Sequence, residues 1–400
     1  MELRGQHGMA DEGSFDRSFV SFTAGKNFAD DRGNAAFSLE YSTQDRFGRG
    51  DREIGRRFMV SVPNPDFDPS QPPSQRNPQN VFARPGGNHS ISYGGVFTIG
   101  SFNVNNPTNR YLFNPDGTFR RARYDGVVVS PTSCVDCDFA DLNAVADLEP
   151  AFDRFSANFQ LNFELNENHR MFFEGKYSKT ESNFYGQPAF DQPIRIRRDN
   201  AFISPELGAL MDANGLTQLQ VTRFNVDAGR RGEDVDRQTV RAVFGFEGNL
   251  GEDWTYEASV NYGQSKIDRR NLNNRINERW HAGLDAVRDE NGNIVCRASI
   301  DEDAVNPHTG TRYSSFASNG CIPFSVFGDG AVARTPEAIA WFNTTSLNSS
   351  TLEQNVVAAS VANSRLFSLP AGDVGFAAGV EYRKEKSQEN TDPLAALGLT

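Results

Sequence analysis

The four cysteines are the residues whose spacing points most directly to chemistry. Cys134 and Cys137 form a C-x-x-C pair, while Cys296 and Cys321 lie far from it, with His308 as the one histidine between them. A zinc site needs a second close cysteine pair or paired histidines at ligand spacing. Because the sequence has neither, structural disulfides are favoured over a zinc site or a thioredoxin-type redox pair.

The other residue types that support catalysis occur without a catalytic pattern. Five histidines form no H-E-x-x-H motif and no close pair in sequence: His7, His89, His169, His281 and His308. The glycine-rich stretch Gly86–Gly95 lacks the lysine of a phosphate-binding loop, and no G-x-S-x-G elbow occurs. The sequence therefore predicts no catalytic, cofactor-binding or metal-binding residue, and the protein is not expected to be an enzyme.

One basic cluster and two capped segments stand out in the polar regions. Arg120, Arg121 and Arg123 follow a hairpin turn expected at Asp116-Gly117, where they could meet an anion, although a solvated loop face is favoured. Two short helices are expected, because each segment starts with an N-cap Ser or Thr, then Pro, then Glu. They are Ser204–Gly215 and Thr335–Phe342.

The elements that carry these residues are mostly strands. In Arg154–Leu165, apolar and polar residues alternate strictly, which is the period of a strand and not of a helix. Phe155, Phe159 and Phe163 fall on the apolar side of this strand. The same alternation occurs in further segments: Ala35–Tyr41, Met171–Tyr177, Val240–Phe246, Trp254–Tyr262 and Phe376–Tyr382.

The connections between these strands are of two lengths. Short polar turns are expected at 29–34, 166–169, 251–253 and 370–373, and long polar stretches at about 44–153, 182–236 and 268–355. Structureless stretches of this size are unusual within a compact soluble domain. Short turns alternating with long loops are typical of outer-membrane β-barrels. A soluble sandwich or barrel that buries the phenylalanine side is the alternative.

Composition limits the classes of protein. The 400 residues carry a formal charge of −12, which argues against nucleic-acid binding. No run of about 18 apolar residues exists, so no transmembrane helix is expected. A transmembrane barrel remains open, because only alternate strand residues face lipid.

Several stretches resemble the barrel region of TonB-dependent outer-membrane receptors. They are Phe22–Arg46, Ala286–Ile300, Gly320–Gly328 followed by Thr335–Phe342, and Leu369–Glu385. The resemblance implies an all-β fold, a partial antiparallel transmembrane β-barrel with about nine strands of a larger barrel and long extracellular loops. Since no plug-like segment is recognisable, residues 1–400 are expected to be an internal part of a receptor barrel.

The same resemblance implies a function and partners. The complete protein would sit in the outer membrane of a Gram-negative bacterium and take up a scarce, bulky solute, such as a siderophore, an oligosaccharide, a cobalamin-like molecule or a peptide. Energy would come from the inner-membrane protein TonB through the plug. The other expected partners are outer-membrane lipids, lipopolysaccharide and the extracellular ligand, with no cofactor and no nucleic acid. The alternatives are a soluble, secreted β-rich binding module and an extracellular glycan-active enzyme.

Within this reading, specific residues receive roles. Six aromatic residues are expected to face lipid: Phe155, Phe159, Phe163, Phe244, Phe246 and Tyr256. The cysteines fall in expected extracellular loops, and the pairs expected to be bonded are Cys134 with Cys137 and Cys296 with Cys321. Residues that contact the ligand are not assigned.

Overall fold

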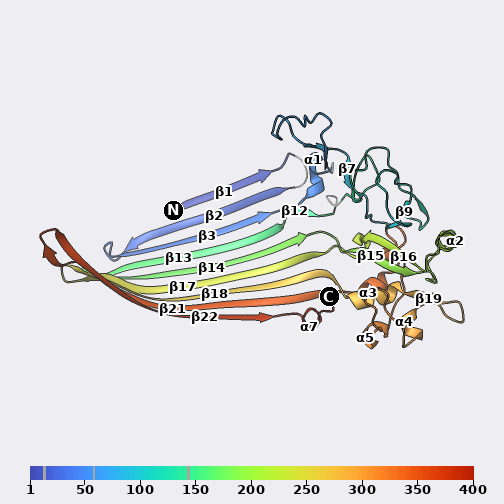
Figure 1. The fold of residues 1–400 in the computed structure, drawn as a ribbon. Coiled ribbons are helices and arrows are strands. Elements are labelled where there is room, and N and C mark those ends of the chain that lie inside the picture. Colours follow the sequence, from blue (N-terminus) through green and yellow to red (C-terminus); the bar gives the residue numbers. More distant parts are fainter. Residues whose placement is uncertain (12–14, 57–58, 142–144) are drawn as a thin grey trace.

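One curved antiparallel sheet of nine strands is the largest sheet of the molecule, as the computed structural model of residues 1–11, 15–56, 59–141 and 145–400 shows (Figure 1). Its strand order is β1-β2-β3-β13-β14-β17-β18-β21-β22. The strands are β1 (Glu2–Met9), β2 (Asp16–Phe28), β3 (Gly33–Gln44), β13 (Ala151–Asn166), β14 (His169–Tyr185), β17 (Gly232–Leu250), β18 (Trp254–Arg275), β21 (Asn343–Leu369) and β22 (Gly372–Asn390). The expected all-β class and the strand count are confirmed.

The four short turns expected from the sequence lie at one end of this sheet. They connect β2 to β3, β13 to β14, β17 to β18 and β21 to β22, at the positions expected from the sequence. The β2–β3 turn places Ala29, Asp30 and Asp31 at positive φ, a conformation that Asp tolerates better than most residues. At the opposite end, three long insertions leave the sheet (Figure 1).

The strands run farther toward the insertions than the alternation predicts. β14 continues to Tyr185, β17 begins at Gly232, β18 ends at Arg275 and β21 begins at Asn343, so the second and third insertions are shorter than expected. In these extensions both faces are polar, which removes the alternation signal while the backbone ladder continues. Opposite charges on neighbouring strands support the pairing, as in the contact between Lys179 and Asp236 at 3.4 Å.

The three insertions are not structureless, contrary to the expectation from the sequence. They comprise residues 45–150, 186–231 and 276–342, and together they form a folded unit at the end of the sheet that we call the cap (Figure 1). Its largest sheet has the order β10-β9-β8-β16-β15 and contains strands from the first two insertions. These strands are β8 (Val96–Thr98), β9 (Arg110–Phe113), β10 (Phe119–Arg121), β15 (Phe190–Arg197) and β16 (Gln218–Phe224).

Smaller elements complete the cap and its connections. The short strands are β4 (Phe47–Gly48), β5 (Val60–Pro63), β6 (Asn80–Ala83), β7 (Gly86–Asn88), β11 (Ser133–Val135), β12 (Asp147–Glu149), β19 (Ala286–Arg288) and β20 (Ile294–Cys296). The α-helices are α1 (Glu53–Arg56), α2 (Pro205–Ala213), α3 (Asn277–Leu284), α4 (Arg297–Ile300), α5 (Ser315–Ser318), α6 (Pro336–Phe342) and α7 (Pro393–Ala396). Among the described residues, no helix has the length and apolar character needed to cross a membrane.

A hydrophobic core holds the cap together. Trp280, Phe324 and Phe342 are at most 1% exposed and their rings pack against one another with centroids 5.0–5.1 Å apart. The same core includes Phe97 from the first insertion and Met211 from the second. All three insertions therefore bury side chains in one core, and none of them would have a comparable core alone.

The local elements expected in these regions are present. Helix α2 is capped by Ser204, whose hydroxyl oxygen accepts a hydrogen bond from the Leu207 amide. Helix α6 follows Thr335 and also begins with proline, but the Thr335 side chain makes no capping hydrogen bond. The hairpin around Asp116 is β9–β10, in which Phe113 pairs with Phe119.

Candidate functional site

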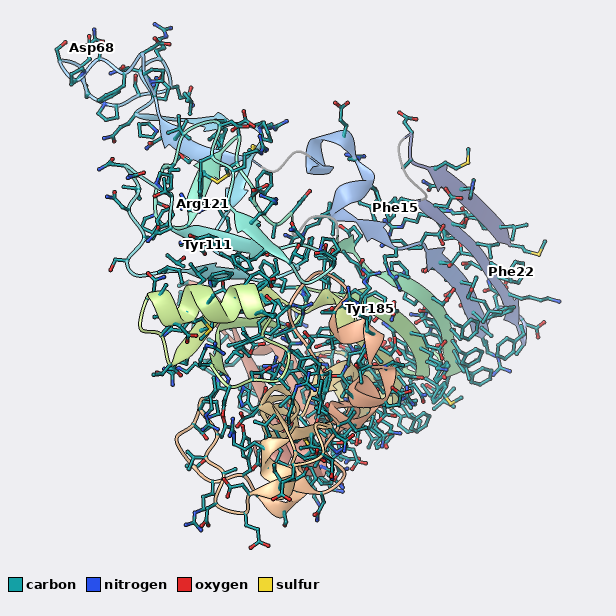
Figure 2. All side chains as sticks on the ribbon, turned by 90° about the vertical axis from the view of Figure 1, so that its right-hand side faces the viewer. Phe15, Phe22, Asp68, Tyr111, Arg121 and Tyr185 are labelled. Carbon is teal, nitrogen blue, oxygen red and sulfur yellow. A yellow bond between two sulfur atoms is a disulfide. The ribbon has the colours of Figure 1, made fainter. Side chains whose placement is uncertain are left out.

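A continuous apolar band crosses all nine strands on one face of the sheet. Directly paired residues of neighbouring strands point to the same face. One such row contains Ala35, Leu161, Phe173, Phe244, Val260, Val357 and Tyr382. On the first strands, Leu3 pairs with Phe22 and Phe22 pairs with Leu39. Figure 2, which views the molecule from the cap end, places Phe22 at the outer rim of the curved sheet.

The residues expected to face lipid all lie in this band. Phe155, Phe159 and Phe163 share the face with Phe244, Phe246 and Tyr256 through the register of β13, β14, β17 and β18. They remain accessible: Phe155 is 40% exposed, and Phe159 and Phe244 are each 39% exposed. Such a large exposed apolar surface normally marks a contact with a membrane or another protein.

Aromatic residues mark both limits of the band. Toward the cap, four strands carry a tyrosine on the apolar side near the end of the band, and these residues form the tyrosine row: Tyr41, Tyr177, Tyr262 and Tyr382. Toward the turns, Phe28 stacks on Phe163, and Trp254 packs edge-on against Phe376. Flanking girdles of this kind are a property of lipid-facing barrel surfaces.

The opposite face of the same strands is polar. On β13 it presents Ser156, Asn158, Gln160 and Asn162. Side chains bond across strands there, as Asn158 does to Ser38 at 3.3 Å. Arg170 and Glu247 form an ion pair on this face near the turns. The apolar face can therefore be covered by an apolar environment at no cost, whereas the polar face requires water or other hydrogen-bonding partners.

A buried ionic network ties the insertions of the cap to the sheet. Arg223 is fully buried and donates two hydrogen bonds to Asp227, at 2.8 and 2.6 Å, and one to the Gly328 carbonyl at 3.1 Å. Arg275, at the end of β18, likewise donates two hydrogen bonds to Asp191, at 2.7 and 3.0 Å. Burial opposes ionisation of Asp191, but the charge and hydrogen bonds of Arg275 outweigh it and keep the pKa of Asp191 below its usual value.

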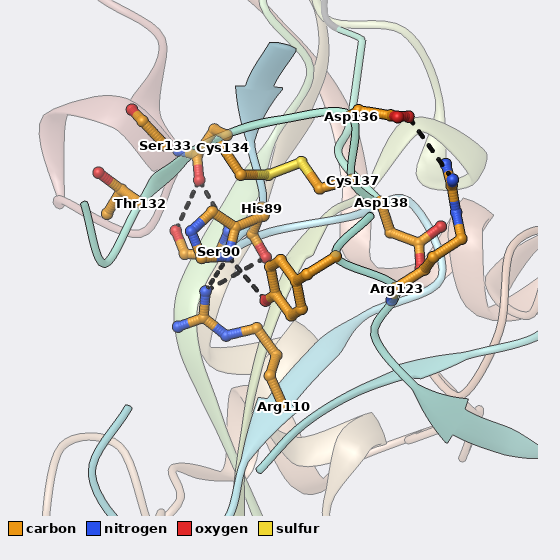
Figure 3. Close-up of a disulfide and its surroundings, with 12 residues drawn as sticks. His89, Ser90, Arg110, Arg123, Thr132, Ser133, Cys134, Asp136, Cys137 and Asp138 are labelled. Atoms are coloured by element: carbon orange, nitrogen blue, oxygen red, sulfur yellow. Dashed lines mark hydrogen bonds and ion pairs between the residues drawn. A yellow bond between two sulfur atoms is a disulfide. The ribbon is translucent and has the colours of Figure 1, made fainter. Parts of the chain in front are cut away.

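The C-x-x-C pair lies beside a second buried polar cluster (Figure 3). Cys134 and Cys137 are bonded to each other and are at most 5% exposed. Nearby, His89 contacts the Tyr124 hydroxyl at 2.9 Å and the Ser130 carbonyl at 3.1 Å, and Arg110 also contacts the ring of His89. Burial lowers the pKa of His89 to about 4, so this histidine is neutral at neutral pH. The cluster has the character of a polar core of the first insertion.

The structure also joins Cys296 to Cys321, the other pair expected from the sequence. Their Cα atoms are 6.1 Å apart, and the bond links β20 to the loop after α5. Among the described residues, no group of three or more His, Cys, Asp or Glu side chains is arranged to hold a metal ion.

Two histidines that are distant in sequence meet in the cap, which sequence reasoning missed. The rings of His281 on α3 and His308 are stacked, with centroids 4.1 Å apart. Burial lowers the pKa of His281 to about 3, helped by the nearby His308. Burial likewise lowers the pKa of His308 to about 4. The pair is therefore neutral at neutral pH, and no spacing in the sequence signals it.

Two of the three arginines in the basic cluster of the first insertion are paired with carboxylates. Arg120 donates to Asp138 at 2.6 and 3.1 Å, and Arg123 forms ion pairs with Asp125 and Asp136. Both arginines are about half exposed. This arrangement is that of a solvated loop face, in which the charges of Arg120 and Arg123 are already compensated and Arg121 lies over the Tyr111 ring.

A cavity of about 520 Å³ opens where the three insertions meet, and we call it the junction cavity. Its lining contains residues of the β9–β10 hairpin, of the start of α2 and of the segment before α6. Aromatic side chains from all three parts form its apolar wall: Phe119, Phe202 and Phe327. Asp116, Glu206 and Arg334 supply its charges. The size is in the usual range for small-molecule sites.

Comparisons with known proteins found only distant similarity, to solved structures. No protein-family model matches the sequence, and no curated protein matches it. Among solved structures, the chain is similar to the siderophore receptor PiuA from Acinetobacter baumannii, with 9% identity and a TM-score of 0.31 over 98% of this chain and 42% of that one. It is also similar to the ferric-catecholate import receptor Fiu from E. coli K12, with 9% identity and a TM-score of 0.31 over 97% of this chain and 46% of that one.

A third similar structure is the outer membrane transporter YddB from Escherichia coli, with 9% identity and a TM-score of 0.26 over 94% of this chain and 35% of that one. The chain therefore spans less than half the length of each of these structures.

Proposed function

We propose that the chain is the β-barrel region of a TonB-dependent receptor in the outer membrane of a Gram-negative bacterium. The receptor imports a scarce, bulky solute that the cap captures from outside the cell. The observation that carries this proposal is the apolar band, which is continuous over nine strands and limited by aromatic residues at both ends. The stretches that resemble receptors of this family support it.

The dimensions of the band suit a bilayer. On β13 it runs from Phe155 to Leu165, which is about 33 Å along a strand at about 3.3 Å per residue. A strand tilted by about 40° would then span about 25 Å, the height of the apolar band of outer-membrane barrels. Lys179 and Lys384 follow the tyrosine row two residues later, in the polar headgroup region that this arrangement predicts.

The two outer strands of the sheet indicate how the barrel closes. Among the described residues, neither β1 nor β22 has a second strand beside it, and such open edges are not stable in lipid. With nine strands in antiparallel order, β1 and β22 run in the same direction. A second copy in the same membrane orientation would therefore pair in parallel, so we propose that further strands of the same receptor close the barrel.

A barrel in the outer membrane would contact lipid, lipopolysaccharide, the solute and the energy-coupling protein. The six band aromatics Phe155, Phe159, Phe163, Phe244, Phe246 and Tyr256 face lipid, and the polar extensions and the cap meet lipopolysaccharide and the solute. Energy reaches the barrel from the inner-membrane protein TonB through a plug domain. The chain performs no covalent chemistry in this scheme.

The alternative of a soluble β-rich module or a secreted glycan-active enzyme requires a cover for the apolar band. In the structure the cap packs at the end of the strands, and Val260 and Val357 in the middle of the band are 48% and 51% exposed. A soluble protein with this surface would aggregate.

The orientation can be tested with two matched epitope insertions. Gly310 in the cap and Gly251 in the β17–β18 turn both have positive φ and open space around them, so each should accept an inserted tag. We expect an antibody to bind intact cells that carry the tag at Gly310, and to bind the Gly251 tag after permeabilisation. Surface labelling of the Gly251 tag alone, or of neither tag, would contradict the proposal.

A further inference from the structure

We propose that the junction cavity binds a polyhydroxylated ring ligand without negative charge, such as one or two units of a neutral oligosaccharide. This inference rests on the proposed uptake function and names the class of solute that the cap captures. It depends on three properties of the cavity: a rigid aromatic wall, hydroxyl groups with free donors, and a charge balance that disfavours anions.

The aromatic wall is held in place by the cap core. Phe327 is 5% exposed and packs against Phe113 with centroids 4.9 Å apart. Phe119 packs edge-on against Phe97 at 5.7 Å. Phe202, from the segment before α2, is packed against the same core. Phe327 is nearly fully buried and supports the wall from behind. The partly exposed rings of Phe119 and Phe202 offer apolar surface to the C–H face of a saccharide ring without a large loss of side-chain entropy.

Hydroxyl groups in the lining are prepared to donate hydrogen bonds. The Ser204 oxygen already accepts from the Leu207 amide, and the Ser325 oxygen accepts from the Phe327 amide, each at 3.2 Å. Neither hydroxyl donates a hydrogen bond to another of the described residues, so its hydrogen is available for an oxygen of the ligand. The carboxylates in the lining can in turn accept from ligand hydroxyls, which is a charge-assisted hydrogen bond.

The charges of the cavity select against an anion. Asp116 and Glu206 bring two negative charges, and Arg334 brings one positive charge. Hydrogen bonds from Thr118 lower the pKa of Asp116, and the charge of Arg334 adds to the effect, so Asp116 is ionised at neutral pH. Arg334 also donates to the Pro115 carbonyl, which fixes it beside this hairpin. A polyanionic metal chelate would meet a site with a net negative charge in a chain of charge −12.

The proposal can be tested by binding measurements on the receptor purified in detergent, with sugars that differ mainly in charge. The neutral probes are cellohexaose, maltohexaose and N-acetylchitohexaose, the cationic probe is the glucosamine hexamer, and the anionic probes are hexagalacturonate and ferric tris-catecholate. We expect at least one neutral hexamer to bind by isothermal calorimetry and each anionic probe to bind at least about tenfold more weakly.

Three variants connect this binding to the cavity. Phe202→Leu and Phe119→Leu keep an apolar side chain but remove the ring, and each should weaken neutral binding about three- to tenfold. Glu206→Gln should weaken it about threefold or more through loss of the charged acceptor. Glu337→Gln is the matched control, because Glu337 is an exposed residue in the first turn of α6 that does not line the cavity. It should leave binding unchanged.

The binding results test the ligand of the junction cavity, and uptake by cells tests the proposed transport function. Binding of neither a neutral nor the cationic hexamer, tighter binding of an anionic probe, or neutral binding that is unchanged in Phe202→Leu and Phe119→Leu would overturn this inference. Uptake of an anionic chelate by cells that express these variants would leave the transport function intact and refute the assignment of the ligand. Neutral binding without uptake would support the cavity and contradict the transport function.

Discussion

Two largely buried ion pairs, Arg223–Asp227 and Arg275–Asp191, connect parts of the chain that meet only in the folded cap. Arg223 and Asp227 are four residues apart, yet their network reaches Gly328 and the Val332 amide in the third insertion. Asp191 and Arg275 join the second insertion to the end of β18. Because these contacts exclude water, removal of one partner leaves the other charge uncompensated.

Asp227→Asn should therefore destabilise the cap strongly. The substitution leaves the fully buried Arg223 guanidinium without its carboxylate, at a cost of about 3–5 kcal/mol. Hydrogen exchange of the α2 and β16 amides would measure the loss. Asp303→Asn is the control, since the Asp303–Arg312 pair is about 70% exposed and should contribute less than about 1 kcal/mol. Equal effects of the two substitutions would show that the network is not important for stability.

The Cys296–Cys321 bond should stabilise the third insertion. It closes a loop with a sequence separation of 25, for which chain entropy predicts about 3.5 kcal/mol, whereas the Cys134–Cys137 ring is much smaller. Non-reducing peptide mapping should recover these two pairs, and Cys321→Ser should lower protease resistance in residues 276–342. Free thiols at all four positions, or a bond from Cys134 to Cys321, would disprove the pairing.

The stacked histidines should make the cap sensitive to acid. The pKa values of His281 and His308 are about 3 and 4 in the folded protein, against about 6.5 in an unfolded chain. As pH falls below about 6.5, the unfolded chain binds protons that the folded cap does not. The free energy of unfolding therefore decreases, down to about pH 4 for the contribution of His308 and about pH 3 for that of His281. The slope is at most about 1.4 kcal/mol per pH unit for each histidine. Above pH 6.5 the pair has no effect on the slope.

Protease resistance of the cap between pH 7 and pH 5 measures this slope. His308→Gln should reduce it, while His7→Gln on the exposed strand β1 should not. An unchanged slope in His308→Gln would contradict the assignment.

Secondary-structure elements differ in how far the sequence determines them. The strict alternation in β13 predicts a strand and also predicts that Phe159 lies on its apolar face. The pattern is informative because successive side chains of a strand point to opposite faces of the sheet. The ends of the strands could not be predicted, because residues such as Lys179 and Asp236 pair across strands that are polar on both faces. Helix α2 was predictable from Ser204 and Pro205, which act within one turn.

The N-capping residue of helix α2, Ser204, allows a prediction about the stability of this helix. Ser204→Ala should destabilise the start of α2 by about 1 kcal/mol, because the Leu207 amide loses its acceptor. Thr335→Ala at the equivalent position of α6 should cost less than about 0.5 kcal/mol, because Thr335 makes no capping bond. Amide exchange at Leu207 and Ala338 would report both. A larger effect of Thr335→Ala would contradict this difference between the two helices.

The molecule as a whole combines a sheet with a lipid-compatible face and a cap with its own core. The sheet was largely predictable, since hydrophobic period and turn positions are local properties of the sequence. The cap was not, because Phe97, Met211 and Trp280 come from three insertions and only share a core after the strands have aligned them. The junction cavity was hidden for the same reason: Phe119, Phe202 and Phe327 have no common motif.

The central claim is that the apolar band faces lipid and the opposite face does not. Phe159 and Gln160 are neighbours on β13 that point to opposite faces near the middle of the band. We predict that Phe159→Arg lowers the free energy of unfolding of the receptor, refolded into lipid vesicles, by about 2–4 kcal/mol, and that Gln160→Arg lowers it by less than about 1 kcal/mol. Equal costs for the two substitutions, or a larger cost at Gln160, would contradict the account.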